Sequence, residues 1–265
     1  MATSTAGDRP GIQSVEIGFR LIMALAATNR PMMLRDIARE AGMPPAKAHR
    51  YMVSYLRIGL VEQDRASGRY DLGARALTLG LAGLARLDTV RLAGPILEEL
   101  CDKIHVTVAL AVWGSHGPTI VRIVDAGGPV TITLRHGTVL SLYKSATGRA
   151  FAAFFRSPFL KAAMDRELGE AATAAKTAIT TVRRQFEKTL AEIRLRGISR
   201  ATGNLTPGIN GFSAPVYDHE GRMVAAITAL GSVGDFDVEW GNPVGEAMKE
   251  AAASLSRRLG HAGNA

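Results

Sequence analysis

The first quarter of the chain carries apolar residues at the spacing of α-helices. Segment 14–28 predicts an amphipathic helix, and the apolar residues of its expected buried face are Val15, Phe19, Ile22, Met23 and Ala26. Two shorter helices are predicted over 34–41 and 45–56, and Gly42 between them stands where a left-handed residue ends a helix. Two extended runs follow, over 60–64 and 69–72, and the Gly-containing turn between them predicts a β-hairpin.

The rest of the chain mixes helical and extended patterns. A helix over 74–85 carries Leu77, Leu81 and Leu84 on one face, which we interpret as packing in a dimer or between domains rather than on a membrane. Further helices are predicted over 88–103, 146–156, 157–168, 169–178, 182–196 and 243–259, and strands over 106–113, 119–125, 130–134, 211–217 and 223–230. This pattern favours an α+β domain with an antiparallel sheet flanked by helices.

Length and composition indicate a globular protein of two domains. The chain has 265 residues, 47% of them hydrophobic and 21% charged, and no apolar run reaches the roughly 18 residues that a membrane span needs. Residues 1–13 lack an apolar signal core and are interpreted as a disordered tail. Cys101 is the single cysteine, which excludes an intrachain disulfide and fits a reducing compartment. We therefore expect a soluble cytoplasmic protein with no membrane partner.

Positive charge is concentrated near the N-terminus. The formal net charge is +8, and residues 1–75 hold eleven Lys and Arg against seven Asp and Glu, so half of the excess lies in under a third of the chain. Helix, glycine turn, basic helix and hairpin follow one another there in the order of a winged helix-turn-helix domain. Such a domain places its second helix in the major groove and its wing near phosphates. Double-stranded DNA is therefore the predicted partner.

The candidate DNA contacts lie on the second helix of the pair, predicted over 45–56 and called the reading helix here, and on the wing. Exposed early residues of the helix must be small or must donate hydrogen bonds to bases. The candidates on the helix are Pro45, Ala46, Lys47, His49, Arg50 and Tyr51, and those on the wing are Arg65, Ser67 and Arg69. The alternative from spacing alone is a three-helix interaction module whose charges are only solvated.

Several long segments resemble the IclR family of bacterial transcriptional regulators. The DNA-binding signature corresponds to LRDIAREAGMPPAKAHRYMVSYLRIGLVEQDRASGRYDLG, and the effector domain to LSLYKSATGRAFAAF, AEIRLRGIS and TPGINGFSAPVYDHEGRMVAAITALG, in that order. The resemblance implies a mainly α winged helix-turn-helix domain over 14–73, a linker helix over 74–87 and an α+β, GAF-like effector-binding and oligomerisation domain over 88–265. It also implies homodimers or homotetramers on palindromic operators, with half-sites roughly 34 Å apart.

The reading helix departs from the family pattern. Where the family commonly has Lys-Ser-Thr, this chain has Pro45-Ala46-Lys47, and Ala46 has no group to donate to a base. We therefore expect direct readout from Lys47, His49 and Arg50. Arg50 has two alternative roles, either clamping a phosphate or bracing the helix through Glu40.

The resemblance also implies an effector pocket. Its residues are Ile132, Ala146, Thr147, Ala201, Ile209, Gly211, Thr228 and Leu230. Ala201, Gly211 and Leu230 stand where the family frequently has Asp, Cys and Ser. These changes remove polarity, and Gly211 is expected to open volume, so the pocket favours a monocyclic aromatic or semi-apolar ligand.

The residues themselves suggest that this ligand is a carboxylate. Segment 145–148 stands at a predicted helix start, where free N–H groups attract anions. Thr147 and Thr228 offer hydroxyl donors and Asn204 offers an amide. The alternative is that Ser145 merely caps its helix and the two threonines face the core.

Other chemistry finds no support in the sequence. The six histidines form neither an HxH nor an HExxH arrangement, and Cys101 is interpreted as a buried small hydrophobe. No metal, cofactor or catalytic residue is predicted. The expected function is a ligand-responsive regulator of a catabolic operon. The alternatives are a constitutive DNA-binding regulator whose second domain only oligomerises, and an enzyme with an accessory winged-helix module.

Overall fold

The computed structural model of the protein describes residues 11–28, 30–127, 134–203, 208–234 and 236–263. The chain divides into two units, the first ending at Leu87 and the second beginning at Asp88. Asp88 itself caps the first helix of the second unit, because its carboxylate accepts a hydrogen bond of 3.0 Å from the backbone N–H of Arg91. Each unit has its own hydrophobic core and is described by itself.

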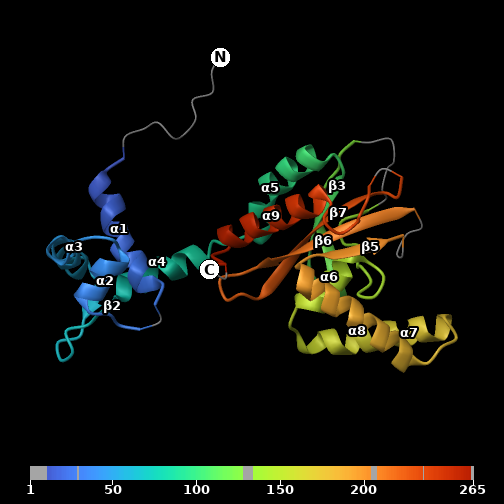
Figure 1. The fold of residues 1–265 in the computed structure, drawn as a ribbon, viewed down its shortest axis with the longest axis horizontal. Helices are drawn as coiled ribbons and strands as arrows, with labels where there is room; N and C mark the ends of the chain where they lie inside the picture. Colours follow the sequence, from blue (N-terminus) through green and yellow to red (C-terminus); the bar gives the residue numbers. More distant parts are fainter. Residues whose placement is uncertain (1–10, 29, 128–133, 204–207, 235, 264–265) are drawn as a thin grey trace, which may run out of the picture. The chain divides into compact units, whose positions relative to one another are not determined.

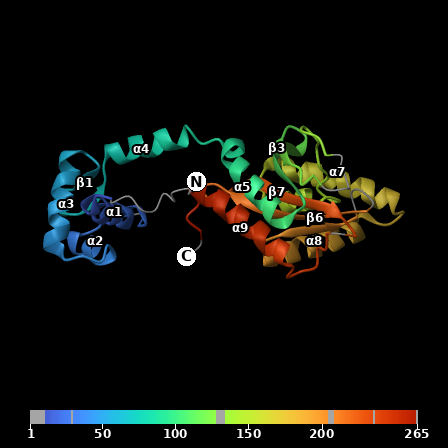
Figure 2. The ribbon, with the colours of Figure 1, turned by 90° about the horizontal axis from the view of Figure 1, so that it is seen from above.

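The first unit is a small helical domain with a two-stranded wing (Figures 1 and 2). Its elements are α1 (Gln13–Ala26), α2 (Leu34–Glu40), α3 (Pro45–Arg57), β1 (Val61–Gln63), β2 (Tyr70–Leu72) and α4 (Ala74–Leu84). Gly42, between α2 and α3, has the left-handed φ of +67° that the sequence predicted for the end of a helix. The strands β1 and β2 pair in antiparallel fashion, which confirms the predicted hairpin.

The buried face of α1 differs from the predicted one. Ile22 is buried as expected, but Val15, Phe19 and Met23 are 63%, 56% and 52% exposed. The side chains that face the core instead are Leu21, Ile22, Ala24 and Leu25, together with the backbone at Gly18. Apolar residues occur on both faces of this helix, so its periodicity fits two orientations. Gly18 favours the observed orientation, since a Cβ atom there would clash with the ring of Tyr51 and the hydroxyl of Tyr55 from α3.

The second unit is a five-stranded antiparallel sheet covered by helices on both faces. The strand order is β4-β3-β7-β6-β5, with β3 (Thr107–Gly114), β4 (Gly117–Val124), β5 (Ser199–Thr202), β6 (Ile209–Tyr217) and β7 (Met223–Ser232). Helices α5 (Thr89–Ile104) and α9 (Pro243–Arg258) lie together over one face, and α6 (Ala146–Phe154), α7 (Pro158–Ala174) and α8 (Ile179–Arg196) lie on the other, as Figure 1 shows. This confirms the predicted α+β class.

The sheet differs from the sequence prediction at two places. The edge strand β5 was not predicted, because its four residues follow directly on the helix α8 and are too short to show an alternating pattern. Of the strand predicted over 130–134, residues 130–133 lie outside the described residues, and Leu134 belongs to no strand.

Cys101 is 4% exposed and packs in the core beneath α5, which confirms that it is a buried small hydrophobe. Burial raises the pKa of its thiol.

Helix α6 packs directly on the segment that precedes it. A Cβ atom at Gly148 would overlap the carbonyl oxygen of Ser141 and the Cα of Leu142. That segment is held in turn by Glu167 of α7, whose carboxylate accepts from the backbone N–H groups of Leu142 (3.0 Å) and Tyr143 (3.2 Å). The start of α6 therefore has little freedom to move.

We predict that Gly148→Ala destabilises the protein by about 1–3 kcal/mol, because the added methyl group meets backbone atoms that cannot turn aside. Gly169→Ala in α7 is the matched control. It adds the same methyl group where nothing lies within 4 Å, and it is expected to stabilise the helix by up to about 1 kcal/mol. Urea unfolding of the two variants measures both effects. Equal free energies of unfolding would contradict the tight packing of α6.

Candidate DNA-binding surface and effector site

Helix α3 presents a cationic face to the solvent. Pro45 occupies its first turn, and Ala48 and Met52 are fully buried against α1 and α2. These anchors turn the intervening residues outward. The exposed candidates are Pro45, Ala46, Lys47, His49 and Arg50.

The charge on this face is not neutralised. The sequence of α3 contains no Asp or Glu, and within the described residues neither Lys47 nor Arg50 forms an ion pair. Glu40 is 3.6 Å from Arg39 instead of bracing Arg50. The alternative role of Arg50 as a brace through Glu40 is therefore not seen, and its guanidinium is open to an anionic partner.

Tyr51 lies differently from the other candidates of α3. It is half-buried, and its ring packs against α1 at Gly18 beside Tyr55. Burial raises the pKa of the Tyr55 phenol, with the neighbouring Tyr51 as a second cause. These contacts give Tyr51 a packing role between α1 and α3.

The wing is organised by Asp64. Its carboxylate accepts from the backbone N–H groups of Ala66 (2.6 Å) and Ser67 (2.9 Å), and these bonds hold the pKa of the carboxyl below its ordinary value. Gly68 follows with φ of +70°. At the tip, Arg65 and Ser67 are exposed. Arg69 is turned back to the carbonyl of Pro31 (3.3 Å), so Arg65 is the wing cation that points freely to solvent.

The predicted effector residues lie where the start of α6 covers one row of the sheet. Ala201 of β5, Gly211 of β6 and Leu230 of β7 are successive partners in the strand register. Ala146 of α6 lies above them, since a Cβ atom at Gly211 would be 3.6 Å from its Cβ. Ile209 and Leu230 are half-buried and the others are buried. Ile132 and Asn204 fall outside the described residues.

The space at Gly211 is filled from the neighbouring strand. A Cβ atom there would be 3.0 Å from Cδ2 of Leu230, so the volume expected from the glycine is taken up by the leucine side chain. The small volume of Gly211 and the large volume of Leu230 compensate each other. A ligand that enters this row must therefore displace Leu230.

The polar groups of the site are buried hydroxyls. Ser145 caps α6, since its Oγ accepts from the N–H of Gly148 at 2.8 Å and donates to the carbonyl of Ser141 at 2.7 Å. Oγ1 of Thr147 lies 2.8 Å from Oγ1 of Thr228, and both side chains are 1% exposed or less. Ser213 of β6 lies 2.9 Å from the same Thr228 oxygen. Sequence reasoning missed Ser213, although it stands two residues after Gly211 and so on the same face of β6.

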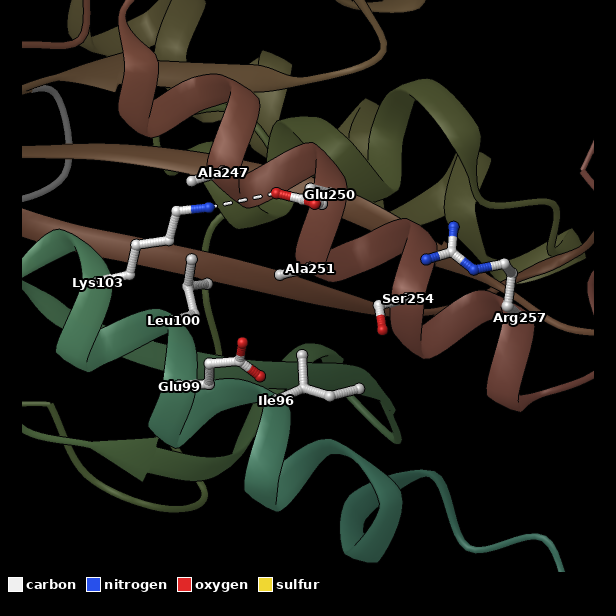
Figure 3. A pocket seen from close by; sticks show the side chains of 9 residues that line it. All are labelled: Ile96, Glu99, Leu100, Lys103, Ala247, Glu250, Ala251, Ser254 and Arg257. Carbon is white, nitrogen blue, oxygen red and sulfur yellow. Dashed lines mark hydrogen bonds and ion pairs between the residues drawn. The ribbon is translucent and has the colours of Figure 1, made fainter. Parts of the chain in front are cut away.

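A separate groove lies on the other side of the sheet, between α5 and α9 (Figure 3). Its volume is about 180 Å³, with Ile96, Leu100 and Ala251 among its apolar side chains. Lys103 and Glu250 form an ion pair of 3.3 Å across it. No predicted effector residue lines this groove, and it is smaller than the pockets that hold drug-sized ligands.

The described part of the chain shows no candidate metal site and no candidate membrane span. No three His, Cys, Asp or Glu side chains are grouped there so as to hold a metal ion. None of the helices described has both the length and the hydropathy to cross a lipid bilayer.

Comparisons with known proteins identify the class of protein. The model of the IclR helix-turn-helix domain matches residues 14–65, and that of the bacterial transcriptional regulator IclR C-terminal domain matches residues 81–257. These matches define a transcriptional regulator and not an enzyme. The chain belongs to the IclR family, as the sequence motifs indicated.

Individual relatives agree with this assignment. The glycerol operon regulatory protein of Streptomyces griseus is 30% identical over 252 residues, which cover 94% of this chain and 97% of the relative. The crystal structure of HmgR from Pseudomonas aeruginosa matches with a TM-score of 0.86 and 35% identity. The match covers 96% of this chain and 100% of the HmgR chain. An IclR homologue from Microbacterium hydrocarbonoxydans, solved with 4-hydroxybenzoate, shares the fold at a TM-score of 0.52 and 21% identity, over 92% of this chain and 98% of its own.

Proposed function

We propose that this protein is a ligand-responsive regulator that binds a palindromic operator of a catabolic operon and responds to a small aromatic or semi-apolar carboxylate. The observation that carries DNA binding is the face of α3, where Lys47, His49 and Arg50 are exposed on a helix without carboxylates. A duplex is the partner that such a face fits, because its phosphates attract the cations and its major groove admits the helix. Arg65 on the wing supplies a further contact to phosphate.

We predict that Lys47→Ala weakens binding to the DNA upstream of the gene and lowers the salt slope of the affinity by about one, because one cation contact is lost. Arg39→Ala is the matched control. Arg39 is also exposed in the first unit, but it already forms ion pairs with Asp36 and Glu40. Mobility shifts over a salt series measure both variants. An unchanged slope for Lys47→Ala contradicts its contact with the duplex.

The lining of the α6 site supports the proposed effector class. Ala146, Ala201 and Gly211 are small and Leu230 and Ile209 are apolar, so the walls favour the body of a flat, apolar ligand. Thr147 and Thr228 put hydroxyls beside the start of α6, where the helix dipole favours an anion. The homologue solved with 4-hydroxybenzoate supports an aromatic acid as a ligand that this fold accommodates.

We predict that Leu230→Ser lowers the affinity for 4-hydroxybenzoate by about tenfold and leaves operator binding without ligand unchanged. The reason is that the ligand loses its apolar contact with the displaced Leu230 side chain, which is worth about 1–2 kcal/mol. Calorimetric titration with 4-hydroxybenzoate, pyruvate and glyoxylate measures the effect. Tight binding of only the two-carbon and three-carbon acids by the unaltered protein would overturn the aromatic class.

A constitutive regulator is the second candidate function. The observation that favours it is the closed packing of the site, where Leu230 fills the space at Gly211 and Thr147 bonds Thr228. In that case the second unit only oligomerises. This candidate is selected if neither an aromatic acid nor another metabolite alters the affinity of the protein for its operator.

Exposed apolar faces in the first unit support the proposal of a homo-oligomer. No residue of α4 is buried, and Leu77, Leu81 and Leu84 are 64%, 55% and 41% exposed on one face of the helix. On α1, Val15, Phe19 and Met23 form another exposed stripe. Apolar stripes of this kind mark an interface, and we propose a second copy as the occupant because a palindrome needs two reading helices. As the linker helix, α4 would then couple effector binding to the separation of the two reading helices.

We predict that Phe19→Glu shifts the protein toward the monomer and weakens operator binding, because a carboxylate in an apolar interface cannot be desolvated without cost. Gln13→Glu is the control, since it adds the same carboxylate to a neutral, exposed position of α1 outside the stripe. Sedimentation of both variants gives the mass, and mobility shifts give the affinity. A dimer of unaltered stability in Phe19→Glu would rule out this face.

A further inference from the structure

A cleft lies at the C-terminal end of α6, where this helix meets the hairpin that joins β6 and β7. Its volume is about 930 Å³, and pockets for small organic molecules typically measure about 300 to 1,000 Å³. The end of α6, the first turn of α7, the last turn of α8 and segment 217–224 line it. None of the described effector residues is among them, because the effector site lies about 12 Å away, at the other end of the nine-residue helix.

One wall of the cleft is apolar. The rings of Phe154 and Tyr217 meet edge to face, with their centroids 6.4 Å apart and an angle of 85° between the ring planes. Phe155 and Leu160 extend this wall, and the ring of Phe155 is itself stacked on Trp113 at 4.7 Å. Because these rings pack on one another, they form a fixed surface on which the apolar body of a ligand can be buried.

The carboxylates of the cleft already have partners on the hairpin itself. Asp218 accepts hydrogen bonds of 2.9 Å from the backbone N–H groups of Glu220 and Arg222. The guanidinium of Arg222 also forms ion pairs with both carboxylates, at 3.1 Å from Oδ2 of Asp218. These bonds hold the hairpin in shape and reduce the negative charge that it presents to the cleft.

Two further arginines of the cleft have no carboxylate partner among the described residues. Arg194, in the last turn of α8, donates from Nε to the carbonyl of Ala153 (3.0 Å), so its side chain is held at the cleft while its two terminal nitrogens remain unpaired. Arg156, just after α6, forms neither an ion pair nor a side-chain hydrogen bond in the described chain. Each guanidinium offers parallel N–H donors that match the two oxygens of a carboxylate.

We propose that this cleft is a second ligand-binding site, which takes an organic dicarboxylate that carries an apolar ring. The two unpaired guanidiniums of Arg156 and Arg194 each bind one carboxylate, and the wall formed by Phe154 and Leu160 buries the ring. The inference goes beyond the proposed function, because it depends neither on the operator nor on the effector at the start of α6. Both arginines are exposed, so salt is expected to weaken the binding.

The test is a calorimetric titration of the full chain with phenylsuccinate, which has a phenyl ring and two carboxylates. Two related acids each lack one of these parts, since succinate has no ring and 3-phenylpropionate has only one carboxylate. Phenylsuccinate is expected to bind at least about fivefold more tightly than either acid, because each of them loses either the burial of the ring or one ion pair.

Arg156→Ala is expected to weaken the binding of phenylsuccinate about fivefold, to the level of 3-phenylpropionate, because one carboxylate loses its partner. Its Tm is expected to stay the same, since Arg156 has no partner to lose within the described residues. Arg184→Ala is the matched control. Arg184 is also exposed and unpaired in the described chain, on the same helix as Arg194, but it does not line the cleft.

Arg194→Lys provides a second variant that keeps the positive charge and removes the paired donors of the guanidinium. It is expected to weaken phenylsuccinate about threefold, because an ammonium group cannot bind both oxygens of a carboxylate in the same way. A general attraction of anions to a basic protein would not distinguish lysine from arginine at this position.

Losses of affinity in Arg156→Ala and Arg194→Lys, with Arg184→Ala unchanged, support the site. Succinate binding as tightly as phenylsuccinate, an equal loss in Arg184→Ala, or no binding of phenylsuccinate by the unaltered protein overturns it. If Leu230→Ser weakens phenylsuccinate and Arg156→Ala does not, the ligand lies at the start of α6. In that case the cleft is not a ligand site, while the proposed effector site stands.

Discussion

The close approach of α6 to its surroundings is the constraint on which the effector domain depends. Ser145 caps the start of the helix, and there is no room for a side chain at Gly148 against the carbonyl of Ser141. Glu167 of α7 holds the same segment through two backbone N–H groups. The start of the helix is thereby fixed above the row that contains Gly211 and Leu230. Any ligand that binds here must displace packed side chains, and this makes the site suitable for coupling ligand binding to a conformational change.

The two units solve opposite electrostatic problems. On α3, cations are kept without carboxylate partners, so that Lys47 and Arg50 are available to a polyanion. Beneath α6, the described polar groups are neutral hydroxyls, and the distances among Thr147, Thr228 and Ser213 show that they satisfy one another. Exposed charge costs little in water, whereas a buried charge without a partner costs several kcal/mol. Under the proposed function, recognition of DNA by charge takes place at the surface and recognition of a small ligand by hydrogen bonds takes place in the core.

How far the sequence predicts the structure depends on the range of the signals. Gly42 and the Gly-containing turn at 65–68 are local conformational signals, and the helix-turn-helix and the wing were predicted from them within a few residues. The apolar stripe of α1 was predicted to be buried and is exposed, because the periodicity is satisfied in two orientations and the packing of Tyr51 and Tyr55 against Gly18 favours the other one. The strand β5 was missed because four residues carry too little pattern. The role of Leu230 in filling the space at Gly211 depends on a pairing between β6 and β7 that no local pattern reveals.

The sequence by itself therefore determined the class of protein, the order of most of its elements and the candidate DNA contacts. These follow from turn residues, helical spacing and the placement of charge, all of which act over a few positions along the chain. Only the tertiary structure decided which way Arg69 points, which face of α1 is buried and which hydroxyls meet beneath α6. Thr147 and Thr228 are 81 positions apart, and the contact between them exists because a helix and a strand from distant segments pack against each other. Such contacts are set by the packing of the whole domain, and local sequence preferences do not specify them.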